Sequence, residues 1–301
     1  LSIGRKFGSM YHVIANPVAG RKKVNQTYVE TLKYLKEASI EHILYETKEY
    51  EDPLQVAKQI DKAYPNGGKM IVIGGDGTIN EVINGLTNLS KWEIGIIPAG
   101  SGNDIAAKLN IPIKKPLEAL NLILNGEAKE MDLIDVNGMK CINIAGSGID
   151  IDVLMRFEKY TKLKGKFRYF WALLMTILTF KWHEFEISVD DGEFFKMSGF
   201  ITAACNGSSY GGGIRICPES IVDDGYMDYV FAKKIKKITI PYYLIQLMKG
   251  KINRYSFYIH QLCKKIVYRS DKKFYFNVDG KIIKSNYFEC KILPKGIAIY
   301  R

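Results

Sequence analysis

Three glycine-containing segments in the first half of the sequence carry the residue types that hold phosphate. The longest lies within residues 71–86, IVIGGDGTINEVINGL, where an apolar run leads into Gly74-Gly75-Asp76-Gly77 and then into a helical pattern. Glycine at three of these four positions lets the backbone turn sharply and approach a ligand closely. The start of the following helix presents free N–H groups and a partial positive charge, which suits a phosphate group.

Asp76 is the unusual residue of this segment, because a carboxylate repels phosphate unless a cation lies between them. We therefore expect Mg²⁺ carried by a nucleotide at this point. Thr78 and Glu81 have the spacing of a capping box, which predicts a helix start there. The alternative interpretation is an ordinary strand-to-helix turn in which aspartate is a turn former.

Two other segments extend this pattern. PAGSGND at 98–104 follows the next apolar run, with Ser101 and Asp104 again at capping-box spacing, and NPVAG at 16–20 follows the first apolar run. If the runs are parallel strands, all three segments emerge at the carboxyl edge of one sheet, where ligands bind. The cations at 21–23 add to this nucleotide site, although they are equally consistent with a solvated helix start. The sequence has no P-loop, GxGxxG or protein-kinase signature.

The elements that must position these segments alternate from residue 11 to about residue 126. Apolar runs typical of buried strands are followed by apolar residues at helical spacing, which predicts a parallel sheet covered by helices. The predicted strands are Tyr11–Ala15, His42–Thr47, Met70–Ile73 and Glu93–Ile97, and the predicted helices fall around 24–35, 53–60, 79–86 and 103–109.

After Met131 the pattern changes to short β-rich runs. Asn137-Gly138 and Asp190-Asp191-Gly192 each separate two such runs, as in hairpins. Further strand-like runs are 265–268, 274–278 and 287–293, and helices are predicted at about 165–181 and 238–248. We therefore expect an α/β plus mostly β protein. Its N-terminal domain, 10–131, is a Rossmann-like parallel sheet, and its C-terminal domain, 132–301, is antiparallel and β-sandwich-like.

Composition narrows the class of protein. Hydrophobic residues make up 47% of the 301 and charged residues 25%, which argues against disorder. The net charge of +11 suits an anionic partner, but equally a solvated lysine-rich surface. Five cysteines form no CxxC pair and four histidines show no metal-ligand spacing, which fits reduced thiols in a cytoplasmic protein. The most apolar stretch, 170–180, is too short to span a membrane.

The three segments, together with YGGG at 210–213, Pro218, DDG at 223–225 and Asp279-Gly280, resemble the diacylglycerol kinase catalytic domain of bacterial lipid kinases. The resemblance covers nearly the whole chain from Met10. GGDGT is shared with NAD kinases and sphingosine kinases, whereas PAGSGND resembles the lipid kinases specifically. The resemblance implies transfer of the γ-phosphate of ATP to the hydroxyl of a membrane lipid, above all diacylglycerol, giving phosphatidic acid.

The resemblance also implies which residues contact ATP and Mg²⁺. The expected nucleotide-binding residues are Asn16, Pro17, Val18, Ala19, Gly20, Thr47, Gly74, Gly75, Asp76, Gly77, Thr78, Ile79, Asn80 and Ser101. The family usually has threonine at the Ser101 position, so a hydroxyl is kept. A structural Mg²⁺ in the second domain would be bound by the Asp224 carboxylate and the main-chain carbonyls of Ile221 and Tyr226, an all-oxygen set. Without the resemblance, 223–225 would be interpreted as a hairpin turn.

The family's C-terminal motif is Asp-Gly-Glu, and its carboxylates are implicated in deprotonating the lipid hydroxyl. This chain has Asp279-Gly280-Lys281 instead, and lysine cannot serve as that base. Asp279 is therefore the expected catalytic base, although an aspartate before glycine is also an ordinary β-turn pair. Lys281 leaves three outcomes open: Asp279 acts alone, another carboxylate replaces the glutamate, or activity is weak or lost.

We expect the partners to be ATP, a membrane lipid acceptor and an anionic membrane surface, with no nucleic acid. The resemblance implies a homodimer, peripheral at the cytoplasmic face of the inner membrane. Basic residues from Lys159 to Arg168 precede an apolar stretch at 170–178, which suits membrane docking but equally a core helix with a charged entry. Two alternatives stay open: an NAD kinase-like enzyme with a soluble acceptor, and a nucleotide- or lipid-binding protein without catalysis. No recognised motif supports a nucleic-acid binder.

Overall fold

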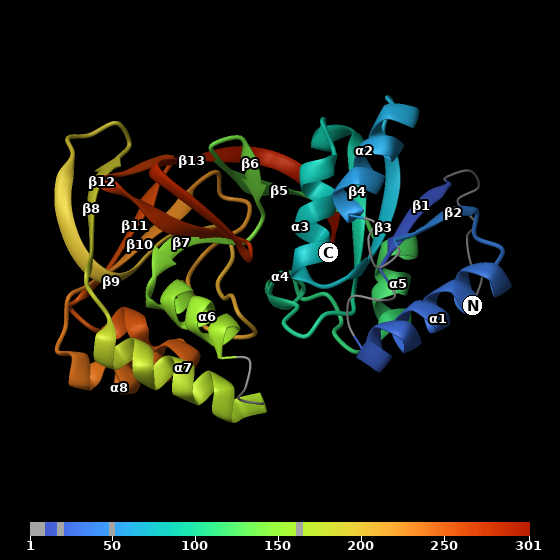
Figure 1. Ribbon diagram of the computed structural model, residues 1–301. Helices are drawn as coiled ribbons and strands as arrows, with labels where there is room; N and C mark the ends of the chain where they lie inside the picture. The colour runs from blue at the N-terminus through green and yellow to red at the C-terminus, as the bar shows by residue number, and fades with distance from the viewer. Residues whose placement is uncertain (1–9, 17–20, 48–51, 161–164) are drawn as a thin grey trace. The chain divides into compact units, whose positions relative to one another are not determined.

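The computed structural model describes residues 10–16, 21–47, 52–160 and 165–301 (Figure 1). Four expected nucleotide-binding residues, Pro17, Val18, Ala19 and Gly20, lie outside this part of the chain. The described residues form two compact units. The first contains the residues up to Asp132 together with Pro294–Arg301, and the second contains Leu133–Leu293.

The first unit is built on a parallel sheet. Its strands are β1 (Tyr11–Ala15), β2 (His42–Glu46), β3 (Gly68–Gly74), β4 (Trp92–Pro98) and the final residues of β13 (Lys281–Tyr300), in the order β2-β1-β3-β4-β13. The pairings along this order are parallel. All of β1 and most of β3 are buried, which explains their continuous apolar sequences, because both faces of a parallel sheet are covered.

Helices cover this sheet (Figure 1). They are α1 (Arg21–Glu37), α2 (Pro53–Ala63), α3 (Asp76–Gly85), α4 (Asp104–Lys108) and α5 (Pro116–Asn125), with the short 3₁₀ helix η1 (Leu89–Lys91) before β4. α2 begins where the Asp52 carboxylate accepts a hydrogen bond from the Leu54 N–H at 2.9 Å. α5, which we did not predict, packs closely on β4: a Cβ added to Gly95 would lie 2.6 Å from Cδ1 of Ile123.

The second unit is dominated by antiparallel strands. They are β5 (Ala128–Val136), β6 (Met139–Cys141), β7 (Ile144–Gly148), β8 (His183–Val189), β9 (Phe195–Cys205), β10 (Met227–Lys233), β11 (Tyr258–Cys263), β12 (Lys265–Val278) and most of β13. Their main order is β11-β10-β9-β7-β12-β13, and β8 pairs with both β9 and β12. The predicted hairpins at Asn137-Gly138 and Asp190–Gly192 are present. The predicted fold class, α/β followed by an antiparallel β-sandwich-like domain, is confirmed.

Two hydrophobic clusters use alternate residues of the same strands. Tyr229 and Phe231 of β10 belong to the cluster that lies among the strands, whereas Val230 belongs to the cluster beneath the helices. Those helices are α6 (Ile149–Lys159), α7 (Gly165–Thr179) and α8 (Ile240–Met248), with the 3₁₀ turns η2 (Lys237–Thr239) and η3 (Ile252–Arg254) flanking α8. We predicted α7 and α8 but not α6. No described helix is long and apolar enough to cross a membrane.

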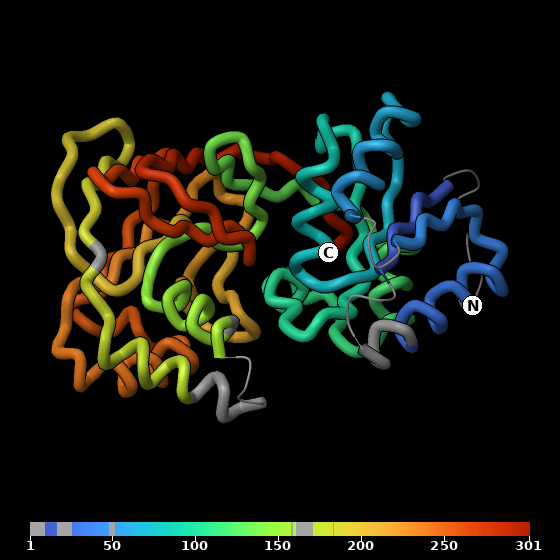
Figure 2. Tube along the Cα trace, in the orientation of Figure 1, coloured from blue at the N-terminus to red at the C-terminus, as the bar shows by residue number. Residues whose placement is uncertain are grey.

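The end of β13 returns to the first unit, where the sequence had assigned all of 132–301 to the second domain. Ala298 and Ile299 pair with β4 in parallel, and Figure 2 shows this red end of the trace inside the first unit. The Lys295 N–H donates to the Asp132 carboxylate at 2.8 Å. The sequence could not indicate this, because β13 is one continuous strand with no break in its pattern where it changes unit.

Candidate functional site

The carboxyl edge of the parallel sheet gathers the segments that the sequence singled out. Asn16 follows β1, Thr47 follows β2, Gly75 follows β3 and Ala99 follows β4. Main-chain hydrogen bonds continue past the strand ends: the Thr47 N–H donates to the Ala15 carbonyl at 2.9 Å, and the Ala99 N–H to the Gly74 carbonyl at 2.9 Å. Because the strands are parallel, these ends all lie on one edge of the first unit.

The glycine loops after β3 and β4 touch each other through their backbones. A Cβ added to Gly75 would lie 2.9 Å from Cα of Gly100, and one added to Gly100 would lie 2.5 Å from Cα of Gly75. Neither position can take a side chain without moving main chain. The two glycines therefore let the backbones of the loops meet.

The loop after β4 is closed by its own asparagine. Asn103 has φ +57°, a left-handed conformation that asparagine tolerates better than most residues. Its Oδ1 accepts from the Gly100 N–H at 2.9 Å, and its Nδ2 donates to the Gly100 carbonyl at 2.9 Å. This leaves Ser101 exposed at the tip of the loop.

Asp76 ties the two loops together. Its two carboxylate oxygens accept the N–H groups of Asp104 and Ile105 at 3.2 Å each, so it caps the start of α4 from the neighbouring loop. Burial raises the pKa of Asp76, the two backbone hydrogen bonds oppose that shift, and the charge of Asp104 adds to it.

Both predicted capping boxes are wrong. α3 begins at Asp76, two residues before Thr78, and its cap residue Gly75 has no side chain to accept a hydrogen bond. At α4 the cap residue is Asn103, and the acceptor comes from Asp76 in another loop. Capping from a distant segment cannot be inferred from local spacing.

The expected nucleotide-binding residues divide by exposure. Gly77 is exposed, and a Cβ added there would meet nothing within 4 Å, while Ser101 is also exposed. The residues that are buried are Thr47, Gly74, Thr78, Ile79 and Asn80. Thr78 packs against Gly74, where a Cβ would lie 2.6 Å from the Thr78 Cβ. The buried residues can support the carboxyl edge of the sheet from within, whereas Gly77 and Ser101 are accessible to a ligand.

Asp279 lies in the second unit, in the two-residue turn that joins β12 to β13. Asp279 and Gly280 have φ +48° and +94°, as in a type I′ hairpin. The carboxylate reaches the segment between β6 and β7. It accepts the N–H groups of Ile142, Asn143 and Ile144 at 2.6, 3.1 and 3.0 Å and the Cys141 thiol at 3.2 Å.

Burial raises the pKa of Asp279, and these hydrogen bonds oppose the shift. A raised pKa suits a carboxyl group that exchanges protons, but its oxygens already accept four donors. Lys281, at the position of the family's glutamate, is exposed on the first residue of β13. The turn therefore offers one carboxylate, held firmly in place.

Asp224 lies in the loop that leads into β10. Its Oδ1 accepts the Tyr226 N–H at 3.0 Å, so the segment is a local aspartate turn rather than the hairpin turn considered from the sequence. Ile221 and Tyr226 have exposed side chains. A carboxylate with two neighbouring carbonyls fits the oxygen preference of Mg²⁺.

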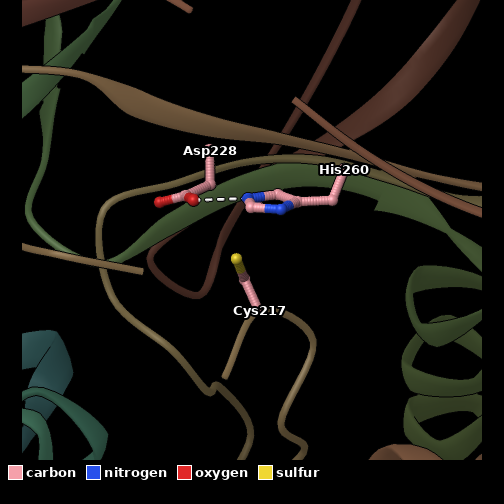
Figure 3. Close-up of side chains that lie close together, drawn as sticks. All are labelled: Cys217, Asp228 and His260. Atoms are coloured by element: carbon pink, nitrogen blue, oxygen red, sulfur yellow. Dashed lines mark hydrogen bonds and ion pairs between the residues drawn. The ribbon is translucent and has the colours of Figure 1, made fainter. Parts of the chain in front are cut away.

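The second unit also holds a titratable cluster that we did not predict: Cys217, Asp228 and His260 (Figure 3). These residues are far apart in the sequence and have no metal-ligand spacing. Only the pairing of β10 with β11 brings Asp228 and His260 together, so no local pattern could have found them.

A parallel α/β unit with glycine loops at its carboxyl edge, followed by an antiparallel β unit, is the architecture expected of the two-domain kinases that the glycine motifs resemble. The sequence profile of the "Diacylglycerol kinase catalytic domain" matches residues 10–136, and that of the "YegS C-terminal NAD kinase beta sandwich-like domain" matches residues 143–301. The chain belongs to the bacterial diacylglycerol kinase family of lipid kinases.

Curated relatives agree with this assignment. The diacylglycerol kinase of Bacillus subtilis is 29% identical over 273 residues, covering 89% of this chain and 88% of that protein. The diacylglycerol kinase of Staphylococcus saprophyticus is 27% identical over 274 residues, covering 89% and 88%.

Solved structures agree with the fold. A putative diacylglycerol kinase from Bacillus anthracis superposes with a TM-score of 0.75 at 23% identity, covering 98% of each chain. An NAD kinase from Archaeoglobus fulgidus in complex with ATP superposes with a TM-score of 0.54 at 12% identity, covering 97% of this chain and 94% of that one. At these identities the likeness concerns the fold alone.

Proposed function

We propose that this protein transfers the γ-phosphate of ATP to the hydroxyl of diacylglycerol, giving phosphatidic acid. The observation that carries the proposal is the backbone contact of Gly75 with Gly100 at the carboxyl edge of the first unit. It holds the two glycine loops together beside the start of α3, whose N–H groups no side chain caps and which therefore suits a phosphate chain, in a chain of the diacylglycerol kinase family.

ATP would bind along this edge. The main chain of Gly75–Gly77 and the hydroxyl of Ser101 are the accessible donors, and Asn16 and Thr47 bound the neighbouring strand ends. Pro17–Gly20 belong to the proposed site through the family resemblance. Asp76 holds the two glycine loops at their fixed separation, so the donors are ordered before the nucleotide arrives.

Mg²⁺ would have two places in this proposal. With ATP, it would offset the charge of the triphosphate near Asp76. In the second unit, the Asp224 carboxylate and the carbonyls of Ile221 and Tyr226 would hold a structural ion that braces the loop before β10.

Asp279 is the proposed base for the lipid hydroxyl. Its burial and raised pKa favour proton uptake at a fixed position. The four donors on its carboxylate and the exposed Lys281 favour a second candidate function, a nucleotide- and lipid-binding protein with weak or no catalysis.

Contact with an anionic membrane surface would be made by α8 rather than α7. Ala172 and Ile177 of α7 are buried in the hydrophobic cluster beneath the helices, as expected of a core helix. Around α8, Ile238, Tyr242, Ile245 and Met248 are exposed, Ile238 by 86%. Seven cations flank this apolar face, namely Lys233, Lys234, Lys236, Lys237, Lys249, Lys251 and Arg254, and residues 229–270 contain no aspartate or glutamate. An exposed apolar face with cations before and after it in the sequence suits an anionic bilayer.

A matched pair of variants tests which helix docks. Met248→Glu on α8 should weaken sedimentation with vesicles containing phosphatidylglycerol, while Leu178→Glu on α7, equally exposed at 64% against 65%, should leave it unchanged. Loss with Leu178→Glu alone would return the docking surface to α7. The same vesicle assay and sedimentation velocity would test the proposed homodimer and peripheral location at the cytoplasmic membrane face.

The catalytic proposal is tested with labelled ATP and Mg²⁺ in mixed micelles containing diacylglycerol, with NAD as a soluble competitor acceptor. We expect labelled phosphatidic acid from the wild type, none from Asp279→Asn, and more from Lys281→Glu. Labelled NADP without lipid product would establish the NAD kinase alternative. ATP binding without any labelled product, in the wild type and in Lys281→Glu, would establish the non-catalytic one.

A further inference from the structure

Three adjacent strands of the second unit present ligand side chains on one face. Cys205 of β9 lies directly opposite Asp228 of β10, and His260 of β11 lies opposite Val230. Because residues i and i+2 of a strand share a face, Asp228 and Val230 point the same way. Cys205, Asp228 and His260 therefore lie side by side on the face covered by the helices.

A fourth side chain comes from the loop between β9 and β10. Cys217 is fixed in this loop by its N–H, which donates to the Ser208 carbonyl at 3.1 Å. Figure 3 shows its thiol pointing toward Asp228 and His260. One ligand atom from each of these three residues lies within 4.8 Å of the others.

The histidine ring lies between two carboxylates. Its Nε2 is hydrogen-bonded to the Asp228 Oδ1 at 2.6 Å, and its Nδ1 faces Oε2 of Glu219 at 3.7 Å. Glu219 is itself held by Nδ2 of Asn253 at 2.6 Å. A metal ion at this place would replace the proton that Nε2 and Asp228 share, and Glu219 would support the ring from its other nitrogen.

The cluster is largely buried. Cys205, Cys217 and Asp228 are each at most 2% exposed, and the His260 side chain is 26% exposed. A buried carboxylate is costly unless a cation faces it, and the Asp228 carboxylate faces the His260 ring at 2.6 Å. A divalent cation among the three side chains would offset the carboxylate and a Cys217 thiolate together.

We propose that Cys217, Asp228 and His260 bind Zn²⁺. One sulfur, one imidazole nitrogen and one carboxylate oxygen are three of the four donors of a tetrahedral site, and a thiolate selects zinc over magnesium. Cys217 binds as a thiolate and His260 as a neutral imidazole, and the displaced protons go to solvent.

The ion would hold the loop 206–226 against two strands, β10 and β11. This loop carries the three glycines at 211–213 and the Asp224 segment, and it is otherwise joined to the strands through a few hydrogen bonds, such as those of Asn206 and Gly207 to the Asn143 carbonyl. Zinc would thus restrain the same loop of the second unit that carries the proposed structural Mg²⁺ site. The zinc site differs in having sulfur and nitrogen ligands, whereas the Mg²⁺ site has only oxygen ligands.

The test uses the full chain, stripped of metal and kept under a non-thiol reductant. Zinc is titrated against a chromophoric chelator, and Co²⁺ is used as a spectroscopic substitute. We expect one equivalent of tightly bound zinc, and for cobalt a thiolate charge-transfer band with intense tetrahedral d–d bands. Cys217→Ser should lose more affinity than Glu219→Gln, whose expected loss is about 10–100-fold.

Cys263→Ser is the matched control, because Cys263 is a buried cysteine on the same strand as His260 but belongs to the other hydrophobic cluster. It should bind zinc like the wild type. Equal zinc affinity in Cys217→Ser and Cys263→Ser would overturn the proposal. So would a wild-type cobalt spectrum without the thiolate band, an outcome that holds even if Cys217→Ser fails to fold.

Discussion

Two aspartates, one in each unit, fasten a distant segment by accepting its main-chain N–H groups. Asp76 accepts two, at the start of α4, and Asp279 accepts three together with a thiol. Asp76 lies in one of two glycine loops that touch each other, whereas Asp279 lies in a tight hairpin turn. The difference shows that an aspartate in a functional motif can serve mainly to hold a distant segment in place. The number of hydrogen bonds that its carboxylate accepts indicates how much it contributes to stability.

Of the variants that test the comparison of the two aspartates, Asp279→Ala should have the largest effect on stability. Three main-chain N–H groups would lose their acceptor, at about 1–3 kcal/mol for each donor left buried and unpaired. We expect the free energy of unfolding in urea to fall by about 3 kcal/mol or more. Asp279→Asn keeps one oxygen acceptor and should lose clearly less. Equal stability of Asp279→Ala and the wild type would show that the carboxylate does not hold the segment in place.

Asp76→Ala should have a smaller effect on stability, about 1–3 kcal/mol, because two longer hydrogen bonds are lost. The glycine loops would also lose their tie, so ATP affinity measured by calorimetry should fall. Asp52→Ala is the control: it removes the cap of α2, away from the loops, at a cost of about 1 kcal/mol. A similar loss of ATP affinity in both variants would attribute the effect to general destabilisation.

Gly75→Ala and Gly77→Ala separate the loop contact from the ligand surface. A Cβ at Gly75 meets main chain at 2.9 Å, so we expect a loss of about 1–3 kcal/mol in unfolding free energy. A Cβ at Gly77 meets nothing within 4 Å, and alanine is up to about 1 kcal/mol better than glycine within a helix. Gly77→Ala should thus be stable yet bind ATP more weakly. Unchanged ATP affinity in it would place the phosphates elsewhere.

The smallest expected effect is on pH dependence. Burial raises the folded-state pKa of Asp279 above 3.8, so its contribution to stability is full below that pH and is lost as pH rises through the raised pKa. Asparagine does not titrate. The stability of the wild type relative to Asp279→Asn should therefore decline as pH rises from 3.8 and level off above the raised pKa, by about 1.4 kcal/mol per unit of pKa shift. A rising difference would mean that the hydrogen bonds outweigh burial.

Much of the fold could be predicted because its signals are local. β1 coincides with the predicted Tyr11–Ala15, and the two predicted hairpin turns have Asn137-Gly138 and Asp190-Asp191 at positive φ. α6 was missed because its alternating start, Ile149-Asp150-Ile151-Asp152, does not show helical spacing clearly. The end of β13 was placed in the wrong domain, because the sheet that it joins is decided by its pairing with β4, a strand far earlier in the sequence.

The position of the candidate site could be predicted from the sequence, but the hydrogen bonds that hold its segments together could not. The glycine loops lie at one sheet edge, as parallel strands require, yet the tie between Asp76 and α4 appears only once both loops are folded. Similarly, the donors to Asp279 come from a segment more than a hundred residues earlier in the sequence. The cysteine, aspartate and histidine cluster depends on strand register, which spacing within one segment cannot reveal.

The return of Pro294–Arg301 to the parallel sheet has a consequence for biosynthesis. β4 leaves the ribosome early, but its neighbour in the sheet emerges only after the whole second unit has been made. Until then the nascent chain presents the edge of β4 unpaired, a surface that invites pairing with other chains. The unit that is translated first is thus completed last, and premature termination shortly before residue 294 would leave its sheet open.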